Sequence, residues 1–224
     1  MKKGAKKKIL IAVAVVVLAV AGIMTWCELY RVAPQPAWIT ADQRDKYFYG
    51  SVGAEHTAGI PYWIWLAMPR MFPEYLPGPG GYAALGLSWE GGKEMPVGFA
   101  KQRIGYVRVT GNCALCHAVS QRTGTDEVPT IIPTVSGQTT EIQPLLAFYR
   151  RCAQDPRFNA DDILAEVETA TTLSFTDRLL YRYVLIPRTR EALLDPAAVL
   201  FDPAIREHSR DPHSRALSVP LPKW

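Results

Sequence analysis

The residues Cys113-Ala114-Leu115-Cys116-His117 decide how this chain is interpreted, because two cysteines are separated by two residues and followed at once by a histidine. On one helical turn this spacing brings both thiols to the same side, with the imidazole next to them. C-x-x-C-H is the attachment signature of c-type haem: the thiols form thioether bonds with the vinyl groups, and the histidine gives an axial nitrogen to the iron. The motif therefore predicts one covalently bound haem c, with thioethers at Cys113 and Cys116 and with His117 as the proximal iron ligand.

Three other kinds of site use two cysteines at this spacing. A zinc site needs a second ligand pair nearby, and His208 and His213, which have a suitable spacing, lie far downstream. A thioredoxin-like dithiol needs a parallel α/β pattern, but only residues 103–112 read as a strand and the later chain reads as helices. A structural disulfide between the two cysteines would leave the histidine without a role. Haem attachment accounts for all three side chains.

Positive charge is concentrated at the N-terminus. The 224 residues carry a formal net charge of +4, but five lysines lie within the first eight residues, so the rest of the chain is close to neutral. A terminal cluster is not a basic patch on a folded face, and it gives no support to nucleic-acid binding. The length suits one domain of ordinary size and a membrane segment.

An apolar segment follows these lysines, because residues 9–26 contain no charged side chain. Its length is near the lower limit for a membrane-spanning helix, and the lysines before it place the N-terminus in the cytoplasm. A cleaved signal peptide is the alternative, since Ala19-Val20-Ala21 resembles a cleavage site. We favour an uncleaved anchor because the apolar run continues past Ala21. In both cases the rest of the chain is exported. We expect a single-pass protein of the bacterial inner membrane with its haem domain in the periplasm.

Composition divides the chain into five segments. We interpret residues 1–8 as a basic cytoplasmic region, 9–26 as the anchor, 27–46 as a tether, 47–195 as the haem domain and 196–224, rich in proline, as an irregular tail. The predicted fold class is mainly α. We expect a cytochrome c-like helical domain with long loops rich in aromatic residues, glycine and proline, preceded by one N-terminal transmembrane helix.

Helical periodicity and capping residues predict four helices in the haem domain. In chain order they cover residues 63–68, ended by Pro69, residues 140–152, residues 161–170, capped by Asn159, and residues 174–187, from Ser174 to Pro187. The last helix carries an apolar stripe that we interpret as core. This stripe comprises Phe175, Leu179, Leu180, Tyr183 and Val184.

The sixth iron ligand decides what the haem does. A methionine or a second histidine makes an electron carrier, whereas an open distal face allows chemistry on O₂ or peroxide. No methionine follows His117 in the sequence. The candidates for a distal ligand are Met95 first, then Met68 and Met71, and among the later residues His208 and His213.

Other side chains before and after the motif have candidate roles. Arg103 and Arg108, with Lys101 beside them, are candidate partners for the haem propionates, because guanidinium groups bind carboxylates in a fork geometry. We interpret Cys152 as a buried thiol, and a disulfide between Cys27 and Cys152 is the alternative.

Several segments occur in a characteristic order: YGSVG at 49–53, GIPYWIW at 59–65, GGY at 80–82, KEMPVGF at 93–99 and NCALCH at 112–117. With them, the chain from about Tyr47 to Leu194 resembles the N-terminal haem region of large multihaem c-type cytochromes related to rubber oxygenase and to the bacterial dihaem cytochrome c peroxidases. The resemblance implies a mainly helical cytochrome c-like fold, His117 as the proximal ligand and an accessible distal side. Members of that family are much longer and carry a second C-x-x-C-H motif, whereas this sequence has one. We therefore expect a truncated relative, a split protein whose partner carries the second haem, or the product of a damaged gene.

Two functions follow as hypotheses. The first is a membrane-anchored periplasmic monohaem c-type cytochrome that carries single electrons to or from a redox partner protein, such as a second haem protein. The second is a haem enzyme of the oxygenase or peroxidase type with an open distal iron site. A haem-based sensor is a third and weaker interpretation, since no output domain is recognised in the sequence.

Overall fold

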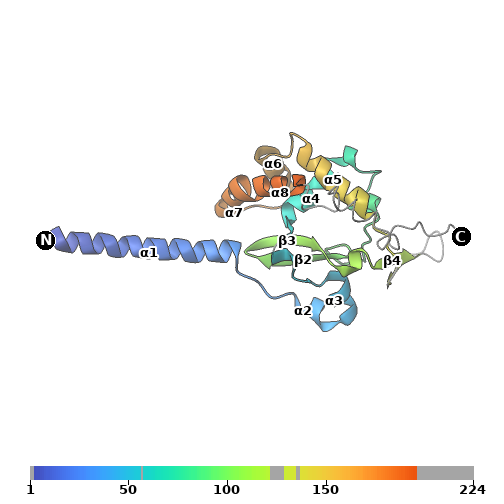
Figure 1. The fold of residues 1–224 in the computed structure, drawn as a ribbon, viewed down its shortest axis with the longest axis horizontal. Helices are drawn as coiled ribbons and strands as arrows, with labels where there is room; N and C mark the ends of the chain where they lie inside the picture. The colour runs from blue at the N-terminus through green and yellow to red at the C-terminus, as the bar shows by residue number, and fades with distance from the viewer. Residues whose placement is uncertain (1–2, 57, 122–128, 135–136, 196–224) are drawn as a thin grey trace, which may run out of the picture. The chain divides into compact units, whose positions relative to one another are not determined.

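A computed structural model of the chain describes residues 3–56, 58–121, 129–134 and 137–195. The described residues are mainly helical (Figure 1). They belong to two compact units: those within 1–66 and 80–141 belong to unit 1, and those within 67–79 and 142–224 belong to unit 2. The expected haem domain, residues 47–195, thus contributes to both units. The expected irregular tail, residues 196–224, lies outside the described residues.

The elements of unit 1 are α1 (Lys3–Leu29), α2 (Ala37–Ala41), α3 (Gln43–Tyr49), the 3-10 helix η1 (Ala54–His56), β1 (Ile60–Pro61), the start of α4 (Tyr62–Met71), the 3-10 helix η3 (Gly81–Leu85), β2 (Phe99–Ile104), β3 (Tyr106–Gly111), the 3-10 helix η4 (Cys113–Leu115), β4 (Ala118–Gln121) and β5 (Thr130–Pro133). Those of unit 2 are the end of α4, the 3-10 helix η2 (Pro73–Tyr75), α5 (Ile142–Gln154), α6 (Ala160–Ala170), α7 (Phe175–Leu180), the π-helix η5 (Tyr181–Leu185) and α8 (Ile186–Leu194).

Helix α1 is apolar on all sides. Every side chain from Lys7 to Trp26 is exposed, including the whole apolar segment. Residues Lys7–Cys27 are long and apolar enough to cross a membrane, a property that a signal sequence shares.

The segment expected as a tether is folded. Val32 forms a β-bridge with Ile104, and Ile39 is buried. Asp42 is the N-cap of α3, where its side chain accepts a hydrogen bond from the Arg44 amide at 2.9 Å. Pro34 and Pro36 lie between the β-bridge and α2. Residues 30–46 therefore form part of unit 1 and are not an extended linker.

The sheet of unit 1 is antiparallel with the strand order β1-β3-β2. Strands β2 and β3 form a hairpin whose register pairs Phe99 with Gly111 at the open end and Ile104 with Tyr106 at the turn. Gly105 makes the turn with a φ of +68°, a conformation that glycine adopts without steric cost. The prediction of a single strand over residues 103–112 is therefore wrong. These residues contain the end of β2, the turn at Gly105 and the whole of β3.

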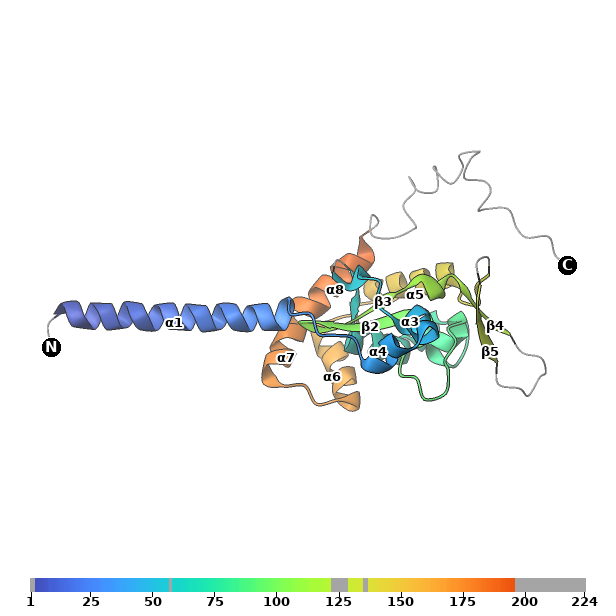
Figure 2. The same ribbon diagram turned by 90° about the horizontal axis from the view of Figure 1, so that it is seen from below.

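A second hairpin follows the motif, where we expected helices to dominate. Strands β4 and β5 lie side by side in antiparallel pairing, with Ala118 opposite Pro133 (Figure 2). The β-branched side chains of Val119, Ile131 and Ile132 favour this extended pairing. The helices predicted after the motif begin only at α5.

Helix α4 corrects the prediction of a helix that ends at Pro69. It begins at Tyr62 and continues through Pro69 to Met71. Proline has no amide hydrogen, so Pro69 leaves the carbonyl of Trp65 without its usual helical donor. The hydroxyl group of Tyr82 donates to this carbonyl at 2.7 Å and so replaces the missing hydrogen bond.

The core of unit 1 is built from aromatic rings. Trp65 is stacked on Tyr82 with 4.3 Å between ring centroids, and Phe99 lies at 5.6 Å from Trp65. All three side chains are buried, as is Phe48 of α3. The aromatic residues before the motif therefore pack on each other.

The capping residues predicted for unit 2 are confirmed. The Asn159 side chain accepts hydrogen bonds from the amides of Asp161 and Asp162 at the start of α6, and Ser174 accepts one from the Asp177 amide at the start of α7. The predicted end at Pro187 is wrong. This proline lies in α8, which follows η5 without a break, so the helical segment passes through it and ends only at Leu194.

The predicted core stripe of this region is also wrong. Phe175 is 77% exposed and Tyr183 70%, and Leu179 and Val184 are exposed as well. The buried side chains are instead Tyr181, Leu185 and Ile186. The π-helical turn η5 changes the angular spacing of side chains, so a stripe counted at regular α-helical spacing does not follow the buried face.

Candidate haem-attachment site

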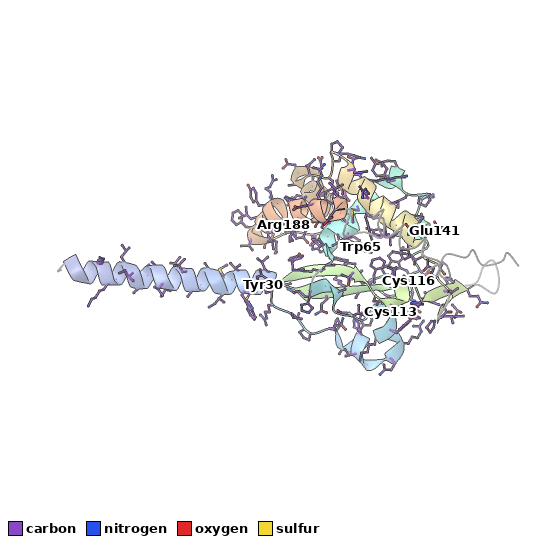
Figure 3. All side chains as sticks on the ribbon, in the orientation of Figure 1. Tyr30, Trp65, Cys113, Cys116, Glu141 and Arg188 are labelled. Carbon is purple, nitrogen blue, oxygen red and sulfur yellow. The ribbon has the colours of Figure 1, made fainter. Side chains whose placement is uncertain are left out.

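The C-x-x-C-H motif follows β3 directly and forms a single tight turn, η4. The amides of Cys116 and His117 donate to the carbonyl of Cys113 at 3.3 and 3.1 Å. The side chains of all three residues are exposed. Figure 3 shows Cys113 and Cys116 near each other where the β2–β3 hairpin ends. The structure therefore exposes the two thiols and the imidazole on one short backbone segment, which the Cys113 carbonyl closes into a turn.

Asn112 holds this turn in place. Its side-chain oxygen caps η4 by accepting from the Ala114 amide at 3.0 Å. Its amide nitrogen donates to the carbonyls of Phe48 and Gly50 at 3.2 and 3.1 Å, and its backbone amide donates to Gly98 at 2.8 Å. Asn112 is only 7% exposed, so these bonds are shielded from water. The start of the motif is thus fixed to the end of α3.

Two glycines allow the turn to approach the hairpin closely. Gly98 has a φ of +89°, and a Cβ atom there would lie 2.4 Å from the Cα atom of Leu115. A Cβ atom on Gly111 would lie 2.7 Å from Cδ2 of the same leucine. Gly98 is required for both its conformation and the close approach.

Tyr47 contacts the motif from α3. Its hydroxyl group donates to the carbonyl of His117 at 3.0 Å, and the Thr134 amide donates to the same carbonyl at 2.9 Å. Burial raises the pKa of Tyr47, and the charge of Cys113 adds to this effect. Tyr47 therefore lies beside the first thiol while it fixes the backbone of the proposed iron ligand.

The four cysteines are free thiols. Burial raises the pKa of the Cys116 thiol, with a further contribution from Cys113, so this thiol is neutral at neutral pH. Cys152 is fully buried in α5, and burial raises its pKa as well. The structure contains neither the Cys27–Cys152 disulfide nor one within the motif, and Cys152 is a buried thiol as we predicted.

The donor set fits a covalently attached haem. Two reduced, exposed thiols and one imidazole on a single turn are the groups that thioether formation and axial ligation need. Within the described ranges, no group of three or more His, Cys, Asp or Glu side chains is placed to hold a metal ion. The described residues therefore offer no second ligand pair for a zinc ion. His208 and His213 lie outside the described residues.

Met95, the first candidate for a distal ligand, lies elsewhere. It is buried and lines a pocket of about 260 Å³ together with Trp38, Ile39 and Tyr49. None of the three motif side chains is among the residues that line this pocket. Met68, the second candidate, is buried in α4.

The candidate propionate partners are engaged away from the motif. Arg103 lies opposite Val107 near the turn of the hairpin, about 20 Å along the strand from Cys113 at roughly 3.3 Å per residue. Arg108 donates from Nη1 to the carbonyl of Glu55 at 3.1 Å and lies over the ring of Tyr106. The structure does not bring these arginines to the motif.

Lys101 is also engaged elsewhere, since its ammonium group pairs with Glu94 and lies 3.9 Å from the ring centroid of Tyr62. Four other residues hold the motif in place by hydrogen bonds or close packing: Asn112, Gly98, Tyr47 and Thr134. None of these roles was predicted from the sequence. Only Asn112 had a recognisable signal, because asparagine before a helical turn is a common N-cap.

Comparisons with known proteins give no match: no family model, no characterised protein and no solved structure is significantly similar to the chain. The resemblance to multihaem cytochromes thus stays a prediction based on the quoted segments.

Proposed function

We propose that this chain is a membrane-anchored c-type cytochrome that carries single electrons in the periplasm. The observation that supports the proposal is the backbone turn on which the side chains of Cys113, Cys116 and His117 are all exposed. In this proposal the cysteines hold one haem c covalently and the histidine is its proximal ligand. When bound, the haem supplies one-electron redox chemistry.

The residues around the turn position these groups. Asn112 fixes the start of the motif to the end of α3, and Gly98 permits the close packing of Leu115. Tyr47 holds the carbonyl of His117, which limits movement of the residue that would bind the iron. A rigid attachment turn favours electron transfer because the protein then reorganises little between redox states.

We further propose that α1 anchors the chain in a bacterial inner membrane, with its lysine-rich end in the cytoplasm. The expected partner is a redox protein, such as a second haem protein. The family resemblance supports a cytochrome c-like domain with long loops, and it also supports a partner that carries the second haem.

A haem enzyme of the oxygenase or peroxidase type is the second candidate. Two observations favour it: no methionine follows His117 in the sequence, and Met95 lines a pocket that the motif side chains do not line. A haem held at His117 alone would keep a distal position for O₂ or peroxide.

A haem stain after denaturing electrophoresis tests the attachment. The full chain, produced in a bacterium with its haem-attachment system, should retain the stain. The double variant Cys113→Ser/Cys116→Ser should lose it, because no thioether can form, whereas Cys27→Ser should keep it. An unstained wild-type protein at normal yield would contradict the proposal.

Carbon monoxide then separates the two candidates. A ferrous spectrum that does not change on addition of carbon monoxide would support the electron carrier, because the iron is then six-coordinate. Rapid formation of a carbon monoxide complex would instead favour the enzyme with an open distal site.

A further inference from the structure

We infer that the pocket beside α2 binds the ring of a para-benzoquinol that arrives from the membrane. The inference rests on the proposed membrane anchor. The pocket lies within unit 1 and has a volume of about 260 Å³, close to the lower end of the usual range for small-molecule sites, so it suits a single substituted ring. Its walls come from the segment 33–39, from the end of α3 and from the β2–β3 hairpin.

Two aromatic side chains form flat walls. The rings of Trp38 and Tyr49 have centroids 5.8 Å apart, and Lys93 holds both through its ammonium group, at 4.4 and 5.3 Å from their centroids. The Tyr49 hydroxyl donates to Glu90 at 2.7 Å, which fixes its ring. These walls are therefore organised before any ligand binds, and their flat apolar surfaces favour an aromatic ring.

Gln102 gives the pocket a specific polar requirement. It lines the pocket and is 6% exposed. Its Nε2 donates to the carbonyl of Ala33, which identifies Oε1 as the other end of the amide. In the described part of the chain Oε1 has no hydrogen-bond partner. A buried acceptor without a donor is costly, so a small rotation of the Gln102 side chain that brings Oε1 to a ligand hydroxyl group would be favoured, whereas a ligand carbonyl would offer no donor.

The pocket is close to the end of the apolar helix. The apolar span ends at Cys27, and Ala33 lies in the pocket wall. The distance between these two residues is at most about 20 Å, the length of a fully extended chain. The Ala33 amide donates to Arg103 at 2.9 Å and the Gly105 amide to Arg31 at 2.8 Å, so the chain leaving the span is tied to the hairpin that forms the pocket. A ligand dissolved in the bilayer can therefore reach the pocket.

The pocket and the haem motif share the end of α3. Tyr49 lines the pocket, while the carbonyls of its neighbours Phe48 and Gly50 accept the hydrogen bonds from Asn112 that hold the motif. A quinol in the pocket would thus contact the same segment that positions Cys113. Two cationic residues line the pocket, Lys101 and Arg103. Lys101 pairs with Glu94, which also lines the pocket, so the exposed Arg103 is the donor proposed for the second ring oxygen.

Calorimetric titration tests the inference, with the full chain in detergent micelles, without oxygen, and a short-chain alkyl para-benzoquinol as the probe. We expect the wild-type protein to bind one quinol per chain. Val107→Phe, which fills the pocket from β3, should weaken binding at least about tenfold, whereas Val52→Phe, an exposed position outside the pocket, should leave it unchanged. No binding by the wild-type protein, or equal binding by both variants, would overturn the inference.

A second experiment compares two ligands on the wild-type protein, so it does not depend on a variant that alters folding. The corresponding para-benzoquinone lacks the hydroxyl donors, so it should bind the wild-type protein about five- to tenfold more weakly than the quinol, as expected for one lost hydrogen bond. Equal affinities would overturn the role of Gln102. The double variant Cys113→Ser/Cys116→Ser should bind the quinol as the wild type does. Failure of haem attachment and failure of the quinol site are thereby distinguished.

Discussion

At the scale of single residues, Gly98 offers the clearest test of how the motif is positioned. Its φ of +89° disfavours any other residue, and a Cβ atom would lie 2.4 Å from the Leu115 backbone. We expect Gly98→Ala to lower the free energy of unfolding by about 2–5 kcal/mol, the sum of a left-handed conformation and an overpacked contact. Urea unfolding followed by tryptophan fluorescence measures this loss, because Trp38 and Trp65 lie in unit 1.

Gly53 provides the matched control. Its φ is +86°, but no atom lies within 4 Å of the position that a Cβ atom would take. Gly53→Ala should therefore cost only the conformational part, about 1–2 kcal/mol. Equal losses in the two variants would show that close packing against Leu115 does not matter.

Asn112 is the second residue whose role can be measured. Asn112→Ala removes the cap of η4 and the side-chain donor to two carbonyls: that of Gly50 loses the Asn112 bond, and that of Phe48 keeps only the bond from the Gly98 amide. Three lost hydrogen bonds of about 1 kcal/mol each predict a loss of about 3 kcal/mol, together with a lower yield of haem-stained protein. Asn112→Asp keeps the capping oxygen but places a second carboxylate oxygen against the carbonyls of Phe48 and Gly50, so it should not restore the yield. A normal yield from Asn112→Ala would contradict the role of this residue in presenting the motif.

At the scale of elements, a charged cluster joins η2 to the turn between α5 and α6 within unit 2. Arg157 donates to both carboxylate oxygens of Asp155 and pairs with Glu74, while the hydroxyl group of Tyr75 donates to Asp155 at 2.8 Å. The Arg157 guanidinium holds the pKa of Asp155 well below its usual range, and Tyr75 contributes in the same direction. The carboxylate form of Asp155 therefore stabilises this unit.

The lowered pKa of Asp155 determines how the stability of the protein depends on pH. A carboxyl group whose pKa is lower in the folded state contributes stability above its unfolded pKa of about 4, and this contribution is lost as the pH falls towards the folded pKa. Asp155→Asn should thus lower the melting temperature most at neutral pH, and the difference from the wild type should shrink below about pH 4. Circular dichroism at a series of pH values measures it. Tyr75→Phe, which leaves Arg157 in place, should show a smaller difference. A difference that is the same at every pH would contradict the role of the ionised carboxylate.

How far the sequence predicts these elements depends on whether the signal is local. Asn159 and Ser174 act within one turn of their own helices, so their caps were predictable from a few residues. Pro69 was misread because its effect depends on Tyr82, which the fold brings to the carbonyl of Trp65. Tyr183 lies in a π-helical turn that no residue pattern indicated, and Phe175 begins a short helix, α7, that has no buried side chain.

The same distinction applies to the candidate site. Cys113, Cys116 and His117 are adjacent in sequence, so their spacing alone predicts that they lie on one turn. The residues that hold the turn, Tyr47 and Gly98, come from distant segments that only the fold brings together. For the same reason, Met95 and the two arginines were candidate haem partners by residue type, but their positions in unit 1 depend on the hairpin register.

At the scale of the whole molecule, the fate of α1 decides where the protein works. Its apolar side chains are exposed along the full span, so an uncleaved helix would hold the chain in the membrane. Cleavage after Ala21 would instead release the rest of the chain as a periplasmic protein that begins at Gly22. The quinol site inferred above requires the first outcome, because its ligand is delivered by the bilayer.

We expect the full chain to remain in the membrane fraction after alkaline carbonate extraction and to retain residues 1–26 by mass spectrometry. Leu18→Arg places a charge near the middle of the span, where insertion costs about 2.5–3.5 kcal/mol, so it should move a large share of the protein out of the membrane fraction. Lys8→Arg keeps the positive charge before the span and should change nothing. A mature protein that begins at Gly22 in the soluble periplasmic fraction would exclude the anchor. The proposed haem attachment at Cys113 and Cys116 does not depend on that result, because in either case we expect the domain to be exported.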